Sequence, residues 1–210
     1  MKVAIILLDY IRHDFTEKVK SVNLHNAGHE FNLIIVDRHG IAAALNEGIE
    51  KSKWADAIVT MANDIVMPNN WLKNMVDSVE RLSHLKIGMV GIHTVESIQP
   101  LDENGVHPTW CPFGNALITR KALNKVGYFN TDHDPYGMQD SDFGYRLDKL
   151  GFYSYYLPNL KAEHIGSDVG SNTEYRKMKD ESLAIAAQKY GNWCAKYNLT
   201  GNYYLPLNQN

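Results

Sequence analysis

The chain has 210 residues, of which 44% are hydrophobic and 21% charged, so it can bury one sizeable core and is unlike disordered or fibrous proteins. Its formal net charge of −3 argues against a non-specific grip on nucleic acid or on an anionic membrane, since both bind basic surfaces. A local basic face near residues 120 to 125 or 176 to 179 remains compatible with this balance.

The cysteine pattern and the first residues bear on localisation. Cys111 and Cys194 lie far apart and neither belongs to a C-x-x-C pair, so we expect free thiols in a reducing cytoplasm. The opening segment "MKVAIILLDYIRHDF" holds an apolar run that is too short for a signal sequence or a membrane span. We therefore expect a cytoplasmic protein without a transmembrane segment, and the sequence leaves room for a homo-oligomer.

The first half alternates apolar runs with helical patterns, which is typical of parallel strands joined by helical crossovers in an α/β sandwich. The runs predict strands at 3–8, 31–37, 55–64 and 86–93, with helices at about 15–28, 40–52 and 69–82 between them. In such sheets, ligands bind beyond the carboxyl ends of the strands. Acidic residues mark three of these ends, and they are Asp9, Asp37 and Asp64.

The second half is less regular. A loop-rich stretch covers 94–114, long enough to suggest a functional segment, and 114–129 predicts a strand, a short helix and a turn. A late strand follows at 151–158, and then a loop leads into a final helix. We expect one domain over residues 1–210, divided into a first half at 1–94, a second part at 95–170 and a C-terminal helix and tail at 171–210.

The segment "QDSDFGYRLDKLG" at 139–151 predicts an amphipathic helix. Phe143, Leu147 and Leu150 share one face at helical spacing, and Gly151 ends the helix where a C′ glycine is expected. Asp142 and Arg146 form a helical i, i+4 pair. Asp140 lies at the leading edge, where it can cap the helix and where the helix dipole favours an anion. Capping explains Asp140 only in part, because a cap does not need the aromatic, glycine-rich approach "DPYGMQ".

Two further segments contain candidate metal ligands. "MANDIVMPNNW" places Asn63 and Asp64 between a strand and a helix, where oxygen donors suit Mg²⁺ or Mn²⁺, although such residues also form turns and caps. "KAEHIGSDVGS" places His164 before a glycine- and serine-rich loop. An imidazole can ligate Mn²⁺, yet a single histidine is more often an ordinary surface residue.

These motifs together resemble family 2 glycosyltransferases with the GT-A fold, over roughly residues 1 to 170. Gly127–Phe129 is similar to the family's G-x-F element, and 139–143 is similar to its E-D-x-D-L, with Gln139 in place of glutamate. "AAALNEGI", "MANDIVMPNNWL" and "AEHIGS" resemble its A-x-N-x-G-I helix, its strand-end acidic motif and its late histidine loop. The implied fold is a Rossmann-like α/β/α sandwich with a mainly parallel central sheet. In that fold, 1–94 would be the nucleotide-sugar-binding half and 95–170 the acceptor-side half.

The resemblance also implies a reaction, which is transfer of a sugar from a nucleotide-diphosphate donor, a UDP-sugar above all, to an acceptor hydroxyl. Asp140 would be the general base of a direct displacement with inversion, and Asp64 with His164 would hold Mn²⁺ or Mg²⁺ on the diphosphate. Donor contacts would come from Tyr10, Arg12, Asp37, Asn46, Asn63 and Asp64. Acceptor contacts would come from Trp110, Gly114, Asn115, Tyr136, Gln139 and Asp142.

The acceptor is open on the sequence, as a saccharide, a lipid-linked glycan, a protein or a hydroxylated base in DNA. Three other protein classes could share an α/β sheet of this kind. A nucleotidyltransferase would need a glycine-rich loop after the first strand, where "LDYIRHDF" has no glycine, and a dehalogenase-type phosphatase would need an aspartate in place of Ile11. A non-catalytic nucleotide-sugar- or glycan-binding protein of the same fold is favoured only by Gln139.

Overall fold

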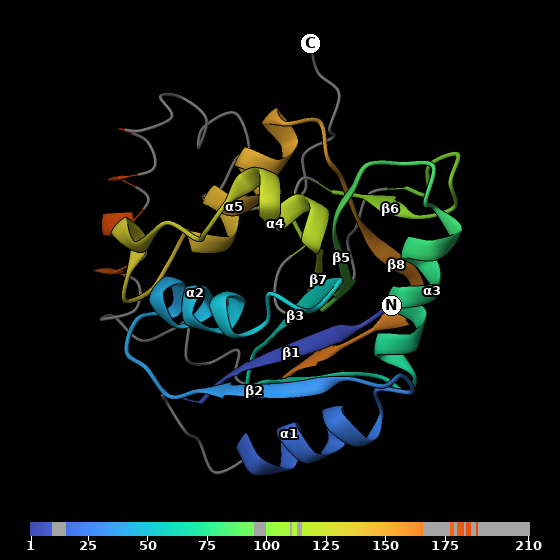
Figure 1. The fold of residues 1–210 in the computed structure, drawn as a ribbon, viewed down its shortest axis with the longest axis horizontal. Helices are drawn as coiled ribbons and strands as arrows, with labels where there is room; N and C mark the ends of the chain where they lie inside the picture. The colour runs from blue at the N-terminus through green and yellow to red at the C-terminus, as the bar shows by residue number, and fades with distance from the viewer. Residues whose placement is uncertain are drawn as a thin grey trace.

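The computed structural model describes residues 1–9, 16–94, 100–109, 111–112 and 115–165, together with 177–178, 180–182, 184–185 and 188. Its elements follow the alternating pattern expected from the sequence (Figure 1), and in chain order they are β1 (Val3–Leu8), α1 (Thr16–His25), β2 (Asn32–Val36), α2 (Ile41–Lys51), β3 (Ala57–Met61), β4 (Ile65–Val66), α3 (Trp71–Arg81), β5 (Ile87–His93), β6 (His107–Pro108), β7 (Ala116–Thr119), α4 (Arg120–Val126), the 3₁₀ turn η1 (Thr131–His133), α5 (Gln139–Lys149), β8 (Tyr153–Lys161) and β9 (Glu163–His164).

A seven-stranded sheet forms the centre, in the order β2-β1-β3-β7-β5-β8-β6, and a small second sheet pairs β4 with β9. The pairings β1–β2, β1–β3 and β5–β8 are parallel, whereas β7 runs antiparallel between β3 and β5 and β6 is antiparallel to β8. This confirms the mainly parallel α/β sandwich. The expected strand at 55–64 ends earlier, at Met61, because the chain turns there and enters the small second sheet as β4.

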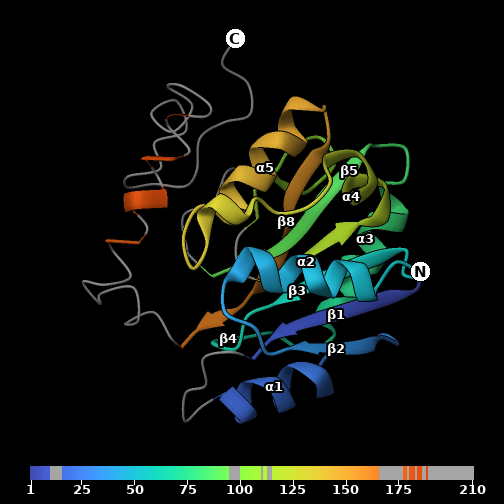
Figure 2. The same cartoon turned by 60° about the vertical axis from the view of Figure 1, so that its left-hand side comes forward.

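Side chains alternate between two cores along the buried strands. Ala4 and Ile6 of β1 belong to the core under α2, α4 and α5, while Val3, Ile5 and Leu7 belong to the core under α3. Figure 2 shows α2 and α5 over one face of the sheet and α1 on the other side of β2. Burial on both faces explains why β1 is a continuous apolar run in the sequence.

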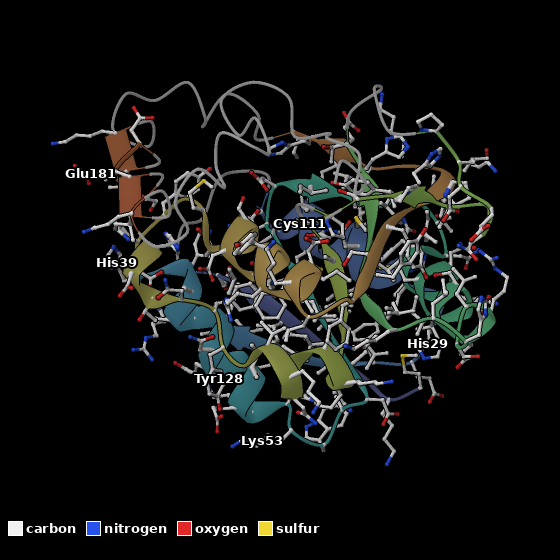
Figure 3. The ribbon with its side chains drawn as sticks, turned by 90° about the horizontal axis from the view of Figure 1, so that it is seen from above. His29, His39, Lys53, Cys111, Tyr128 and Glu181 are labelled. Atoms are coloured by element: carbon white, nitrogen blue, oxygen red, sulfur yellow. The ribbon has the colours of Figure 1, made fainter. Side chains whose placement is uncertain are left out.

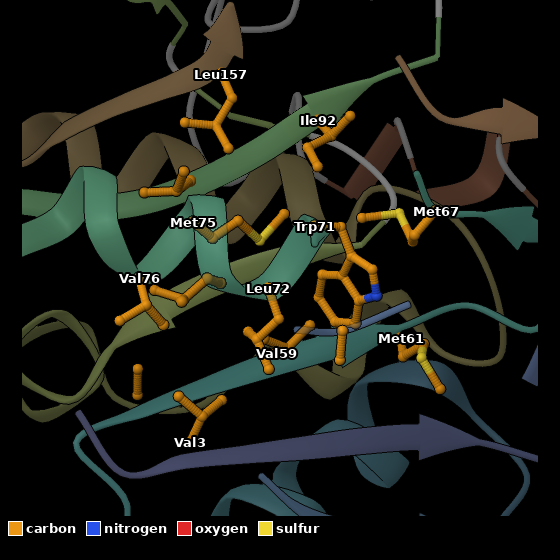
Figure 4. Close-up of a cluster of buried hydrophobic side chains, with 14 of the residues drawn as sticks. Val3, Val59, Met61, Met67, Trp71, Leu72, Met75, Val76, Ile92 and Leu157 are labelled. Carbon is orange, nitrogen blue, oxygen red and sulfur yellow. The ribbon is translucent and has the colours of Figure 1, made fainter. Parts of the chain in front are cut away.

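The core under α3 contains a large side chain that also fixes a loop. Trp71 is fully buried between Met61 and Met67 (Figure 4), and its indole N–H donates to the backbone oxygen of Asn23 in α1 at 2.8 Å. Asn23 is buried as well, and its side-chain amide donates to Ile65 O and accepts from Met67 N, both at 2.8 Å. Helix α1 therefore holds the turn that carries Asp64.

Helix α5 matches the predicted segment with two corrections. Phe143 and Leu147 are buried as expected, but Leu150 is 45% exposed, because the helix ends at Lys149 and Leu150 turns away from the core. The N-cap position falls on Met138, in a left-handed conformation with φ of 30°, so Asp140 lies inside the first turn instead of capping it. Gly151, with φ of 69°, is the C′ glycine that the sequence predicts.

Candidate active site

The structure joins Asp64 and His164, which lie 100 residues apart in the sequence. Asp64 follows β3 in the turn before β4, and His164 lies on β9, which pairs with β4 in the register Ile65 to His164. The imidazole Nε2 is 3.0 Å from Asp64 Oδ2, and Ile165 N donates to Asp64 O at 2.9 Å. This pairing places both predicted metal ligands at the carboxyl end of β3, the edge where ligands bind in such sheets.

The Asp64–His164 pair is accessible and electrostatically coupled. Its side chains are 21% and 41% exposed, respectively, so a ligand can approach them from solvent. The hydrogen bond to Asp64 raises the pKa of His164, against the opposing effect of burial. No group of three or more His, Cys, Asp or Glu side chains suited to a metal occurs in the described part of the chain. One carboxylate and one imidazole fit a hard divalent cation that takes its other ligands from water and from phosphate oxygens.

Asp140 lies half-buried in the first turn of α5. Its Oδ1 accepts a hydrogen bond from Ser141 N at 2.7 Å, and its backbone oxygen accepts one from Cys111 Sγ at 3.1 Å. Cys111, labelled in Figure 3, lies beside α5 and is fully buried. Burial raises the pKa of the Cys111 thiol well above its ordinary value, and the Asp140 charge acts in the same direction. The thiol is therefore a neutral donor that helps to place Asp140.

A short stretch before β7 connects Asp140 with the Asp64 turn. Asn115, four residues after Cys111, is buried and accepts a hydrogen bond from Ala62 N at 2.6 Å through Oδ1. Its Nδ2 is buried too and has no hydrogen-bond partner in the part of the chain that the structure describes. Cys111 thus contacts the start of α5, and Asn115 contacts the backbone just after β3.

Asp142 has a structural role in place of the predicted acceptor contact. Its side chain is 0% exposed and accepts hydrogen bonds from Arg146, at 2.8 Å from Nε and 2.6 Å from Nη2. Arg146 also donates to Val126 O and Tyr128 O, both at 3.0 Å, so the predicted pair holds the turn after α4. On its other side, Asp142 Oδ1 lies 3.7 Å from Nε2 of the buried His133.

Asn46, for which the sequence predicts a donor contact, also has a structural role. Its side-chain Nδ2 donates to Phe129 O at 2.9 Å, and its Oδ1 accepts from Phe129 N at 2.8 Å. Both polar atoms of the amide thus bond to the backbone of the same residue. The pairing attaches the G-x-F turn to α2. An asparagine at this position of the helix is consistent with either role, so sequence reasoning alone could not separate them.

Asp134 caps helix α2 from a distant loop, a role that sequence reasoning missed. Its carboxylate accepts from the backbone N–H groups of Ala42 and Ala43 at 2.8 Å and 3.0 Å, which caps α2 from a distant loop. Gly40 precedes the helix with φ of 89°, and a Cβ on it would meet the Asp134 carboxylate at 2.8 Å. The glycine in "RHGIAAAL" and the absence of a local cap residue were the available signals.

The remaining predicted residues fall into two groups. In the first, Asp37 is exposed after β2, Asn63 and Tyr136 are half-buried, and the buried Gln139 Oε1 has no hydrogen-bond partner within the described residues. The second group lies outside the described residues and consists of Tyr10, Arg12, Trp110 and Gly114. Asp9 at the end of β1 is buried, and its backbone N–H donates to Val36 O at 3.1 Å.

Comparison with known proteins identifies the fold. No protein-family model matches the sequence, and no curated protein is significantly similar to it. Among solved structures, a mannosyltransferase from Pyrobaculum calidifontis in complex with GDP-mannose and Mn²⁺ aligns over 98% of this chain and 76% of its own, with a TM-score of 0.58 and 16% identity. The chain has the GT-A fold.

Two further structures share this GT-A fold. The catalytic domain of Drosophila β1,4-galactosyltransferase 7 with xylobiose aligns over 78% of this chain and 70% of its own, with a TM-score of 0.54 and 17% identity. A mutant of that enzyme with manganese, UDP-galactose and xylobiose aligns over 85% and 74%, with a TM-score of 0.54 and 16% identity. At such identities the likeness establishes the GT-A architecture, and the activity must be argued from the site.

Proposed function

We propose that the chain is a metal-dependent glycosyltransferase, which moves a sugar from a nucleotide-diphosphate donor to an acceptor hydroxyl with inversion. The observation that carries this proposal is the 3.0 Å pairing of Asp64 with His164 at the carboxyl edge of a GT-A sheet. Both residues suit Mn²⁺ or Mg²⁺, and structures of the same fold hold Mn²⁺ with GDP-mannose or manganese with UDP-galactose.

The donor side would be formed by the ends of the first three parallel strands. A divalent cation held by Asp64 and His164, with Asn63 beside it, would neutralise the charge that develops on the departing diphosphate. Tyr10, Arg12 and Asp37 are our candidates for contacts to the base, ribose and phosphates, with a UDP-sugar as the first donor to test. For both residues to ligate the metal, the hydrogen bond between His164 Nε2 and Asp64 Oδ2 would have to break.

The acceptor side would be formed around the start of α5. Asp140 would take the proton of the attacking hydroxyl, because a carboxylate is a suitable general base and the helix dipole favours an anion in the first turn of α5. Its position is supported by Cys111, whose thiol donates to the Asp140 backbone oxygen. Trp110, Gly114, Asn115, Tyr136 and Gln139 are our candidates for contacts to the acceptor, which would be a saccharide, a lipid-linked glycan, a protein or a modified DNA base.

Nucleotide release tests the activity directly. The protein is incubated with a panel of UDP- and GDP-sugars and Mn²⁺. We expect one donor to be consumed and one free nucleotide diphosphate to be released for each donor molecule. Binding of a donor without release, in the presence of a range of saccharide acceptors, would favour the non-catalytic alternative. Absence of any donor binding would contradict both.

Calorimetry of nucleotide diphosphate binding tests the metal site separately from turnover. We expect the affinity to rise with Mn²⁺ in the wild type and to lose this dependence in Asp64→Ala. Asp77→Ala on α3 is the matched control, because Asp77 is exposed and pairs only with Lys73 one turn earlier. Equal metal dependence in wild type and Asp64→Ala would remove Asp64 as a ligand.

A further inference from the structure

A surface centred on α4 combines exposed hydrophobic and cationic side chains. We call it the α4 patch and define it by Trp54, Lys121, Lys125, Tyr128, Lys149 and Leu150. Trp54, Tyr128 and Leu150 are 45%, 47% and 45% exposed, and they are three of the six exposed large hydrophobic side chains among the described residues. Their gathering on one surface is unusual, because exposed apolar side chains are normally scattered singly.

Contacts between backbone segments make the patch continuous. Arg120, at the start of α4, donates to Ala55 O at 2.9 Å, which joins the start of α4 to the segment that carries Trp54. Tyr128 follows the end of α4, and its backbone oxygen accepts from Arg146, whose own carbonyl accepts from Leu150 N at 3.2 Å. Figure 3 shows Lys53 and Tyr128 on the side of the molecule formed by α2 and α4.

The lysines of the patch differ from three lysines on other helices. Lys20 on α1, Lys51 on α2 and Lys73 on α3 each form an ion pair within one helical turn, at 2.6 Å, 2.7 Å and 2.5 Å. Lys121, Lys125 and Lys149 are exposed and form no ion pair with any residue that the structure describes. Lys149 Nζ lies over the Tyr145 ring, 5.4 Å from its centre, a contact that carries no opposite charge. Uncompensated positive charge therefore gathers here on a chain whose net charge is −3.

The composition of the patch indicates the kind of partner. Both arginines beside it are engaged with the protein, since Arg120 donates to Ser52 O and Ala55 O and Arg146 bonds Asp142, Val126 O and Tyr128 O. A nucleic-acid surface would present such guanidinium groups to phosphates. Exposed Trp, Tyr and Leu side chains among unpaired lysines instead suit the interface of an anionic bilayer, where rings enter the headgroup region and lysines meet lipid phosphates.

We propose that the α4 patch docks the protein on anionic phospholipid bilayers. The described residues contain no helix of the length and hydrophobicity needed to cross a membrane, so the contact would be peripheral. Helix α4 begins after Thr119, which pairs with Ala57 at the start of β3, whereas Asp64 follows the end of β3. The start of α4 and the Asp64–His164 pair therefore lie at opposite ends of β3. A protein docked through the α4 patch keeps its candidate active site open.

Vesicle co-sedimentation tests the proposal without any assumption about catalysis. We expect binding to vesicles of phosphatidylcholine with phosphatidylglycerol, weaker binding at raised salt, and no binding to phosphatidylcholine alone. The double variant Lys121→Gln/Lys125→Gln should lower the partition constant about 25-fold, since each lysine contributes about 1 kcal/mol, or about fivefold. Trp54→Ser should lower it further through the apolar contact.

Matched variants make the outcome decisive. Lys20→Gln/Lys73→Gln changes the net charge equally but alters α1 and α3, and it should bind like the wild type. An equal loss in this control would reduce the effect to net charge and overturn the proposal, as would no binding to anionic vesicles at low salt. Duplex DNA that displaces the protein from vesicles and binds it through the same lysines would assign the patch to nucleic acid instead. Unchanged thermal unfolding confirms that each variant is folded.

Discussion

Asp134 Oδ1 accepts a hydrogen bond at 2.8 Å from the backbone N–H of Ala42, which lies 92 residues earlier in the chain. Helix α2 begins after Gly40, which has no side chain to act as a cap, so the carboxylate from the distant loop replaces the local one. The same loop leads into α5 and Asp140. The contact thus joins α2 to the segment that precedes the candidate base.

Loss of this remote cap should destabilise the protein. We expect Asp134→Ala to lower the free energy of unfolding by about 1–2 kcal/mol, because two N–H groups lose their acceptor and the helix dipole loses an anion. Urea titration of the variant measures this. Asp132→Ala, in the exposed η1 turn two residues earlier, is the control and should stay within about 0.5 kcal/mol of the wild type. Equal stability of the two variants would contradict the capping role.

Gly40 should tolerate a side chain even less well. Gly40→Ala places a Cβ 2.8 Å from the Asp134 carboxylate and also strains a backbone with φ of 89°. We expect a larger loss of stability than for Asp134→Ala, and a double variant that is more stable than the sum of the two losses predicts, because Asp134→Ala removes the clash but not the strain. Additive losses in urea titrations of the four proteins would show that Asp134 and Gly40 are independent.

Much of this fold could be predicted because its strands are short-range patterns. The apolar run at 3–8 matches β1, and 86–93 matches β5 to within one residue, since buried parallel strands are continuous and apolar. The antiparallel β7 between β3 and β5 could not be predicted in this way. Its order in the sheet depends on long-range pairing, and nothing in "ALIT" states which strands lie beside it.

The candidate site shows the same division. The sequence motifs around Asp64 and His164 predicted a pair, and the small β4–β9 sheet brings the two side chains together. Asn46 and Asp142 were assigned to ligands, yet both bond to the protein itself, because a polar residue in a motif can serve the fold or the substrate. Only the three-dimensional contacts distinguish these roles.

The buried Asp142–Arg146 pair should be sensitive to removal of either partner. We expect Arg146→Met to lower the free energy of unfolding by about 3 kcal/mol or more, because it leaves the Asp142 carboxylate buried without its cation and releases Val126 O and Tyr128 O. Lys51→Met, which breaks the exposed pair with Glu47, is the matched control and should change stability far less, because solvent screens an exposed ion pair. A similar cost for both variants in denaturant titrations would show that burial of Asp142 contributes little.

Cys111 should make stability fall in mild alkali. Its pKa is raised from the ordinary value of 9.0 by burial, so the folded protein keeps the thiol proton to a higher pH than the unfolded chain does. The contribution is complete below the unfolded pKa, and above it the free energy of unfolding should decrease by up to about 1.4 kcal/mol per pH unit.

Urea titrations between about pH 8 and pH 10 test this in a Cys194→Ser background, where Cys111 is the one remaining thiol. Cys111→Ala should be less stable throughout, because it leaves a cavity, but it should lack this part of the slope. The buried Tyr155, whose pKa is raised to about 12, is common to both proteins, so its effect cancels in the comparison. Identical slopes would contradict a buried neutral thiol in the folded protein.

The last prediction concerns Asp140 as the general base. Asp140→Asn keeps the size of the side chain and its acceptor for Ser141 N, so the start of α5 should be unchanged. We expect transfer to fall by about 10²- to 10⁴-fold, while the affinity for the nucleotide-sugar donor stays within a factor of two or so. Asp148→Asn, further along the same helix, is the matched control. Wild-type-like turnover of Asp140→Asn would remove Asp140 as the base, whereas a parallel loss of donor affinity would place its carboxylate on the donor side of the site.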